Sequence, residues 1–129
     1  KAADLIIIAP SNPIVSILPI VDIPGFREAL INRKGFCVAV SPIVGGKAIK
    51  GPAVSMMKAL GHLPNAVGVA RIYKGLIDAM VIDEVDTSLT PLINKLGHQV
   101  WLEQTVMRTR ADKKNLAKNI VKRFKSVEE

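Results

Sequence analysis

The chain is organised around residues 41–52, which read SPIVGGKAIKGP. They lie between an apolar run at 36–40, typical of a strand, and a segment at 53–60 whose apolar residues have helical spacing. Two adjacent glycines, Gly45 and Gly46, let the backbone approach a ligand closely and turn main-chain N–H groups toward it. The stretch is therefore predicted to be a strand-to-helix loop that binds a phosphate.

Charge and helix chemistry around this loop favour the same interpretation. Lys47 and Lys50 place positive charge on either side of the turn. Pro52 suits the first position of a helix, and the amides at Ala53 and Val54 would then lie at the positive end of the helix dipole. The P-loop and dinucleotide-binding motifs do not match, because alanine follows Gly-Lys and the two glycines are adjacent. The alternative is a flexible loop with two solvated lysines.

The composition indicates one globular domain. The 129 residues are 49% hydrophobic, which suffices for a packed core, and the apolar runs are too short to span a membrane. Lys1 leads directly into a strand-like run without a recognisable signal peptide, so a cytoplasmic protein is expected. Cys37 is the only cysteine, which excludes an internal disulfide, and it is expected to be a small buried hydrophobe.

The net charge of +7 is concentrated near the end of the chain. Residues 105–129 hold eight Lys or Arg and three Asp or Glu, against ten and eight in the remainder. Apolar residues recur there at helical spacing, which predicts a helix docked by an apolar stripe of Leu116, Ile120, Phe124 and Val127. Aromatic residues make up only 4% of the chain, so a base-stacking surface and nucleic-acid binding are not expected.

The chain as a whole alternates strand and helix patterns. Expected strands lie at 5–9, 36–40, 79–83 and 99–103, and expected helices at 26–32, 53–60, 66–74, 90–96 and in the basic terminal segment. This alternation predicts an α/β fold with a mostly parallel sheet of about four strands and helices on both faces. Ligands of such sheets bind beyond the carboxyl ends of the strands. The loops expected there are Ser11-Asn12, 41–51, 83–86 and Gln104-Thr105.

Several motifs, in order along the chain, resemble the 2-phospho-L-lactate transferase family. They are residues 9–13 (APSNP), 41–53 (SPIVGGKAIKGPA), 68–70 (GVA) and 81–83 (VID). The resemblance implies a step in the biosynthesis of the deazaflavin coenzyme F-420. In that step lactyl diphosphoguanosine, or a phosphoenolpyruvyl counterpart, donates its phospholactyl group to the deazaflavin Fo, and GMP leaves. The resemblance also implies Mg2+ as cofactor and a Rossmann-like domain. A homodimer is expected as well, although no residue spacing indicates it.

This resemblance covers only the carboxyl-terminal part of the family's domain. Family members begin with a glycine-rich nucleotide loop and acidic residues for metal and Fo, and none of these precedes Lys1. Residues 1–129 are therefore expected to be the carboxyl-terminal portion of a single α/β transferase domain whose upstream part is absent. The metal ligands and Fo-binding residues are expected upstream, no catalytic residue is assigned, and the segment alone is expected to be inactive.

The chemistry of the matching motif positions indicates substrate-binding roles. Lys47 and Lys50 would neutralise diphosphate oxygens, and the amides of the two glycines would donate hydrogen bonds to them. Ser11 and Asn12 would hydrogen-bond the phosphate or the acceptor across the strand ends. The complete predicted substrate-binding set is Ser11, Asn12, Ser41, Gly45, Gly46, Lys47, Lys50 and Gly51.

Other polar residues are interpreted as structural. Asp83, Glu84 and Asp86 could hold a magnesium ion, but helix capping in a solvated acidic turn is the preferred interpretation. His62 and His98 have no second ligand at metal spacing, so a zinc site is not expected. The sequence thus assigns no metal ligand.

Three competing functions remain open. A non-catalytic nucleotide-sugar-binding regulator of a related family shares this architecture and would lack the upstream acidic motif. A nicotinamide dehydrogenase would carry Asp or Glu at the end of its second strand, where this chain has Ser41. The third is an interaction domain whose basic terminal helix contacts a partner.

Overall fold

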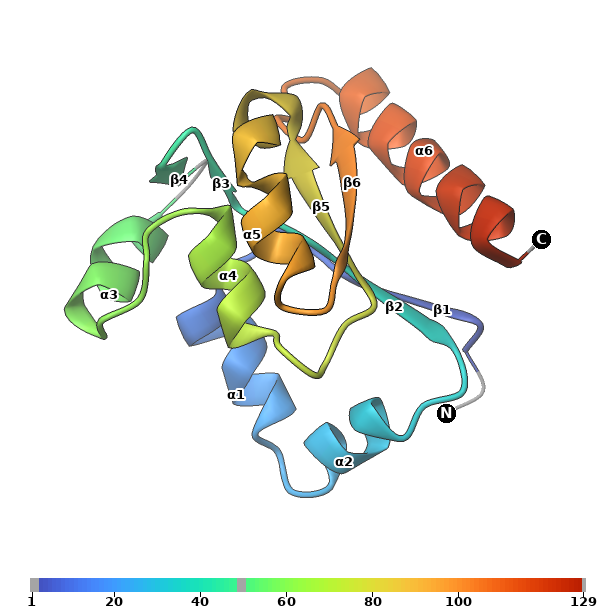
Figure 1. Ribbon diagram of the computed structural model, residues 1–129, viewed down its shortest axis with the longest axis horizontal. Helices are drawn as coiled ribbons and strands as arrows, with labels where there is room; N and C mark the ends of the chain where they lie inside the picture. Colours follow the sequence, from blue (N-terminus) through green and yellow to red (C-terminus); the bar gives the residue numbers. More distant parts are fainter. Residues whose placement is uncertain (1–2, 49–50, 129) are drawn as a thin grey trace.

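A four-stranded parallel sheet forms the centre of the molecule (Figure 1). The computed structural model describes residues 3–48 and 51–128. Leu5 of the first strand pairs with Phe36 of the second, and Asp83 with Glu103 at the far end of the sheet. The strands, in spatial order, are β1 (Leu5–Ile8), β2 (Phe36–Val40), β5 (Ala79–Asp83) and β6 (Gln99–Glu103). The predicted α/β fold with a parallel sheet is confirmed.

Short helices connect the strands. The β1–β2 connection holds the π-helix η1 (Pro13–Ile17), α1 (Leu18–Val21) and α2 (Phe26–Ile31). The β2–β5 connection holds α3 (Ala53–Ala59) and α4 (Ala66–Ile72). The β5–β6 connection holds the 3-10 helix η2 (Glu84–Leu89) and α5 (Thr90–Asn94), and α6 (Arg110–Glu128) follows β6. The expected elements are therefore present, with ends that differ by a few residues.

Helices cover both faces of the sheet, as predicted. In Figure 1, α6 lies on one side of the strands and the earlier helices lie on the other. Alternate residues of β2 face the two sides, which explains why the whole strand is apolar. The core under α6 contains Val38, Val40, Val81, Trp101, Leu116, Ile120 and Phe124. The opposite core includes Cys37, Ala39, Met80 and Ile82 of the sheet and Val67, Ala70 and Ile93 of α4 and α5.

The apolar stripe of α6 is shorter than predicted. Leu116, Ile120 and Phe124 are buried, but Val127 keeps 44% of its surface exposed. No helix in the part of the chain that the structure describes is both long and apolar enough to cross a membrane.

The stretch after β2 differs from the predicted simple loop. β3 (Ile43–Val44) and β4 (Lys47–Ala48) pair antiparallel as a hairpin around Gly45 and Gly46, whose φ angles are +60° and +78°. Two-residue hairpins favour turns with positive φ, which two glycines adopt without a steric cost. Pro52 stands at the N-cap position of α3, without a side-chain capping hydrogen bond, and is not, as predicted, its first helical residue.

Candidate functional site

The predicted ligand loops lie at one edge of the sheet. Because all four strands are parallel, their carboxyl ends point the same way (Figure 1). Ser11-Asn12 follows β1, the hairpin follows β2, η2 follows β5 and Thr105 follows β6. The topology thus places the loops as the sequence predicted, although it does not make every residue in them available to a ligand.

Asn12 connects the β1 loop to its surroundings. Its Oδ1 accepts hydrogen bonds from the main-chain N–H of Ile14 at 2.9 Å and of Val15 at 3.4 Å, which caps η1. Its Nδ2 donates to Met56 Sδ of α3 at 3.5 Å. The neighbouring Ser11 is half-buried, and its N–H donates to Ala9 O at 2.7 Å. Since α3 also packs on β4, it links this loop to the hairpin.

Ser41 lies in the turn that starts the hairpin. Its side chain is fully buried. The hydroxyl donates to Ile43 O and accepts from Ile43 N–H, both at 3.2 Å, while the Ser41 N–H donates to Val81 O at 2.9 Å. These contacts give Ser41 a structural role in the turn, and its substrate-binding role stays a prediction.

The hairpin tip is available only in part. The Gly45 N–H donates to both carboxylate oxygens of Asp86, at 3.0 and 3.2 Å. This amide is therefore not free to donate to a phosphate, which differs from the prediction. Gly46, Lys47 and Gly51 are exposed. Lys50 lies outside the described residues. The Gly45–Asp86 contact joins positions 41 residues apart, and no pattern in the sequence pointed to it.

Asp83 joins the carboxyl ends of β5 and β6. Its Oδ2 accepts from the Thr105 N–H at 2.9 Å and the Thr105 hydroxyl at 3.2 Å, and its Oδ1 accepts from the Val85 N–H at 3.1 Å. Burial is the largest single influence on its pKa and acts to raise it. The hydrogen bonds from Val85, Thr105 and Val106 together outweigh burial and lower the pKa below its ordinary value. Asp83 is thus a capping carboxylate, as the sequence favoured, but the expected solvated turn is wrong for Asp83 and Asp86, which are both buried.

A small polar hollow of about 300 Å³ lies beside α6 at the same edge. Glu103, on its wall, accepts hydrogen bonds from Asn119 Nδ2 and from the Arg123 guanidinium. Within residues 3–48 and 51–128, no three His, Cys, Asp or Glu side chains are grouped so that they could hold a metal ion. The remaining lining residues are Glu84, Gln104, Asp112, Asn115 and Leu116.

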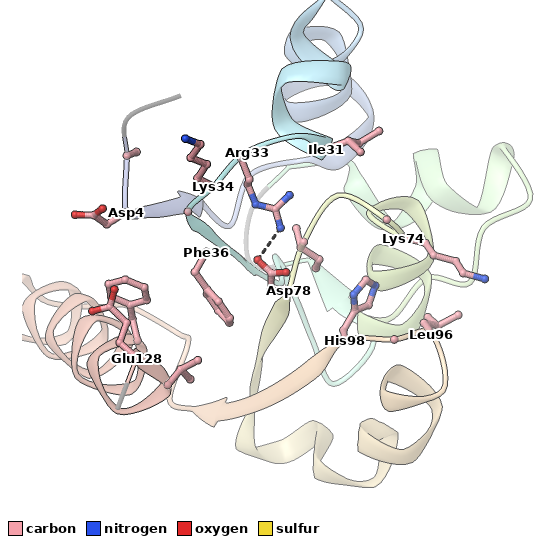
Figure 2. A pocket seen from close by; sticks show the side chains of 17 residues that line it. Asp4, Ile31, Arg33, Lys34, Phe36, Lys74, Asp78, Leu96, His98 and Glu128 are labelled. Carbon is pink, nitrogen blue, oxygen red and sulfur yellow. Dashed lines mark hydrogen bonds and ion pairs between the residues drawn. The ribbon is translucent and has the colours of Figure 1, made fainter.

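The larger hollow, about 920 Å³, lies at the opposite edge, where the strands begin. Figure 2 shows the Arg33 guanidinium turned to the Asp78 carboxylate. Arg33 Nη2 lies 2.6 Å from Asp78 Oδ2, which also accepts from the Cys37 N–H at 2.8 Å. His98 is buried, and its Nε2 donates to Ala70 O at 3.0 Å. These contacts join α2, α4 and the strand starts, so we interpret the hollow as a structural junction.

The single cysteine does not add a reactive centre. Burial raises the pKa of the Cys37 thiol to about 11, with smaller and opposed effects of the neighbouring Arg33 and Asp78. Such a thiol is protonated at neutral pH and is a poor nucleophile. The carboxyl edge of the sheet therefore remains the candidate functional site.

The parallel sheet with helices on both faces is consistent with a portion of a Rossmann-like α/β domain, and polar loops follow the carboxyl ends of its strands. The family model described as 2-phospho-L-lactate transferase CofD matches residues 1–125. The chain belongs to this family.

Curated relatives agree with the family match. The chain is 44% identical to the 2-phospho-L-lactate transferase of Methanocaldococcus jannaschii over 121 residues, 94% of this chain and 37% of that protein. It is 43% identical to the enzyme of the same name from Methanococcus maripaludis strain C6, over 98% of this chain and 39% of the relative. For Methanothermobacter thermautotrophicus the values are 42%, 92% and 38%. The chain thus spans about two fifths of the length of these relatives.

Proposed function

We propose that the complete protein containing this chain transfers a 2-phospholactyl group from lactyl diphosphoguanosine, or the phosphoenolpyruvyl group of its counterpart, to the deazaflavin Fo. The observation that carries the proposal is the family match over residues 1–125, supported by relatives that bear the transferase name at 42–44% identity. In the reaction a ribityl hydroxyl oxygen of Fo forms a bond to the phosphorus that carries the acid. The bond from that phosphorus to the GMP oxygen breaks, GMP leaves with the electron pair, and the hydroxyl proton passes to a base.

Within this chain, we assign donor binding to the carboxyl edge of the sheet. Phosphoryl transfer depends mainly on positioning and on neutralising charge, so a cation near the diphosphate is the principal requirement. The exposed Lys47 of the hairpin would supply this cation, and the exposed Gly46 precedes it in the chain. Ser11 and Asn12 would contact the phosphate or the Fo hydroxyl from the β1 loop.

Magnesium belongs to the proposal for the complete protein, but the residues of this chain do not fit its site. Asp83 accepts three hydrogen bonds with its two oxygens, Asp86 shares the single N–H of Gly45 between its two oxygens, and both carboxylates are buried. A Mg2+ ion keeps several waters and binds carboxylates that are open to it, which these buried groups are not. We therefore place the metal ligands in the remainder of the protein, and we propose a cytoplasmic homodimer.

The test is an assay of the complete gene product with Fo, the guanylated donor and Mg2+, measuring GMP release and the phospholactylated deazaflavin. We expect turnover by the complete protein and none by residues 1–129 alone. Lys47→Ala should lower kcat/KM for the donor at least tenfold, about 1.4 kcal/mol. Lys58→Ala, which removes an exposed lysine from α3, is the matched control.

Two results would contradict the proposal. Binding of the donor without GMP release in the complete protein would indicate the non-catalytic regulator instead. An unchanged kcat/KM in Lys47→Ala would remove this lysine from the donor site.

A further inference from the structure

Asp86 lies in η2, the 3-10 helix that follows β5, and contacts the hairpin at Gly45. Its φ and ψ angles of −101° and 18° interrupt the helical geometry of η2. Only 7% of the residue is exposed. A carboxylate this deeply buried needs strong hydrogen bonds, because transfer of its charge from water is costly. The donor recorded for it within the described residues is the N–H of Gly45.

The hairpin is short. Each of its strands is two residues long, and isolated hairpins of much greater length are only marginally stable. Its base is fixed, since Ile43 is buried and β4 packs on α3. At the tip, a Cβ atom added at Gly46 would meet nothing within 4 Å, and one added at Gly45 would meet Val85 of η2 at 4.0 Å. Within the described residues, the Gly45–Asp86 hydrogen bond is thus the polar contact that joins the turn to η2.

The position of this contact matters for the residues that follow it. Gly45 is two residues before Lys47, and Lys47 pairs with Val44 across the hairpin. Fixing the Gly45 amide therefore fixes the plane of the turn and the direction in which Gly46 and Lys47 leave it. If the contact were lost, the turn would sample other orientations, and only a fraction would suit a ligand. The apparent affinity would fall by that fraction.

We propose that Asp86 is a positioning residue of the donor site, whose carboxylate holds the Gly45 amide and so fixes Gly46 and Lys47 in the orientation that receives the donor's phosphate. Asp86 does not touch the donor itself. This inference rests on the proposed function, because it presumes that the hairpin binds a phosphate group.

The first experiment tests the contact in the 129-residue chain without substrate. Amide hydrogen exchange of Gly45, followed by NMR, should be at least tenfold faster in Asp86→Ala than in the wild type. Asp86→Asn keeps a carbonyl oxygen as acceptor and should retain part of the protection. Glu84→Ala removes a neighbouring exposed carboxylate from the same helix and should leave Gly45 exchange unchanged. Equal exchange in wild type and Asp86→Ala would overturn the inference.

The second experiment uses the complete protein in the GMP-release assay. Asp86→Ala should raise the donor KM about tenfold, with kcat and the KM for Fo within twofold of wild type. Asp86→Asn should recover much of the loss, and Glu84→Ala should behave as wild type. A merely structural role would lower the active fraction and hence kcat without this selective change in donor KM.

The outcomes distinguish a failure of the proposed function from a failure of the positioning role of Asp86. If the wild-type protein releases no GMP, the proposed function fails, while the exchange experiment still decides whether Asp86 holds the hairpin. If the wild type is active and Asp86→Ala leaves the donor KM unchanged, only the positioning role fails. A lower donor KM in Asp86→Ala would mean that the carboxylate competes with the donor, which also overturns the proposal. If Asp86→Ala does not fold, Asp86→Asn with its donor KM decides.

Discussion

At the scale of single residues, the two buried carboxylates after β5 perform different tasks with the same kind of bond. Asp83 accepts from Thr105, which follows β6, and from Val85 of η2, so it joins the ends of β5 and β6. Asp86 accepts from Gly45, so it joins η2 to the exposed turn of the hairpin. Both are buried; Asp83 accepts from two main-chain N–H groups and a hydroxyl, whereas Asp86 accepts from the single N–H of Gly45. The first supports the fold and the second supports the candidate site.

Replacing Asp83 should destabilise the chain in a pH-dependent way. An amide in Asp83→Asn must turn its NH2 group toward one set of the present donors, so it cannot accept all of these bonds. We expect a loss of about 1–3 kcal/mol in the free energy of unfolding at pH 7, measured by urea denaturation. Because the folded pKa is lowered, the wild-type advantage is full above the unfolded pKa of about 4 and is lost as the pH falls through the folded value.

Asp22→Asn is the matched control for this prediction. Asp22 forms an exposed ion pair with Arg27 at 3.0 Å, and such pairs contribute little. Its replacement should change the free energy of unfolding by less than about 0.5 kcal/mol. A constant difference between wild type and Asp83→Asn from pH 7 to pH 2 would contradict the role of the ionised Asp83 carboxylate.

The role of a polar side chain could be predicted from the sequence only where its hydrogen-bond partner is close in the sequence. The capping role of Asp83 follows from its place at the end of an apolar strand, before a helix. The burial of Ser41 did not follow, because a serine after a strand is equally compatible with a ligand and with a closed turn. The Gly45–Asp86 bond depends on how the hairpin folds back over β5. The separation of 41 residues leaves no local signal for that.

At the scale of elements, α4 shows how a close backbone approach can reverse an ordinary preference. Alanine in a helix interior is normally favoured over glycine by about 1 kcal/mol. A Cβ atom on Gly68 would lie 1.8 Å from Leu63 O, a main-chain atom that cannot move aside. Gly68→Ala should therefore destabilise the chain by more than about 3 kcal/mol or prevent folding, as seen by circular dichroism and urea denaturation.

The comparison variant for α4 is Gly46→Ala in the hairpin turn. Its Cβ would meet no atom within 4 Å, so only the positive φ of +78° opposes it. The expected cost is about 1–2 kcal/mol. Similar losses in the two variants would show that the Leu63 approach does not restrict Gly68.

The hairpin could have been recognised from the sequence as an element. Gly45-Gly46 is a two-residue turn between Ile43-Val44 and Lys47-Ala48, a pattern typical of tight hairpins. A strand before the stretch and a helix after it favour the phosphate-loop interpretation instead. The structure contains both this strand and this helix, and the two short strands of the hairpin lie between them.

At the scale of the whole molecule, the sheet separates two cores that differ in how they are built. One face is covered by several short helices, whereas the other is covered by α6 alone. The alternation of strands and helices predicted both layers. The alternation did not predict the strand order. Because β2 and β5 are apolar on both faces, their residues do not indicate which strands lie beside them. The lysines of α6 remain on its exposed surface while its apolar stripe packs on the sheet, and Arg123 is half-buried against Glu103.

Because α6 alone covers its face, that core should depend strongly on its aromatic contacts. Phe36 stacks on Trp101 with ring centroids 5.6 Å apart, and Phe124 of α6 lies 6.1 Å from Phe36. Phe124→Ala removes a largely buried ring and should lower the free energy of unfolding by about 3 kcal/mol. The emission of Trp101, the only tryptophan, should shift to longer wavelength as water reaches it. Lys122→Ala, on the exposed side of the same helix, should change neither quantity, and an unchanged stability in Phe124→Ala would mean that α6 contributes little to this core.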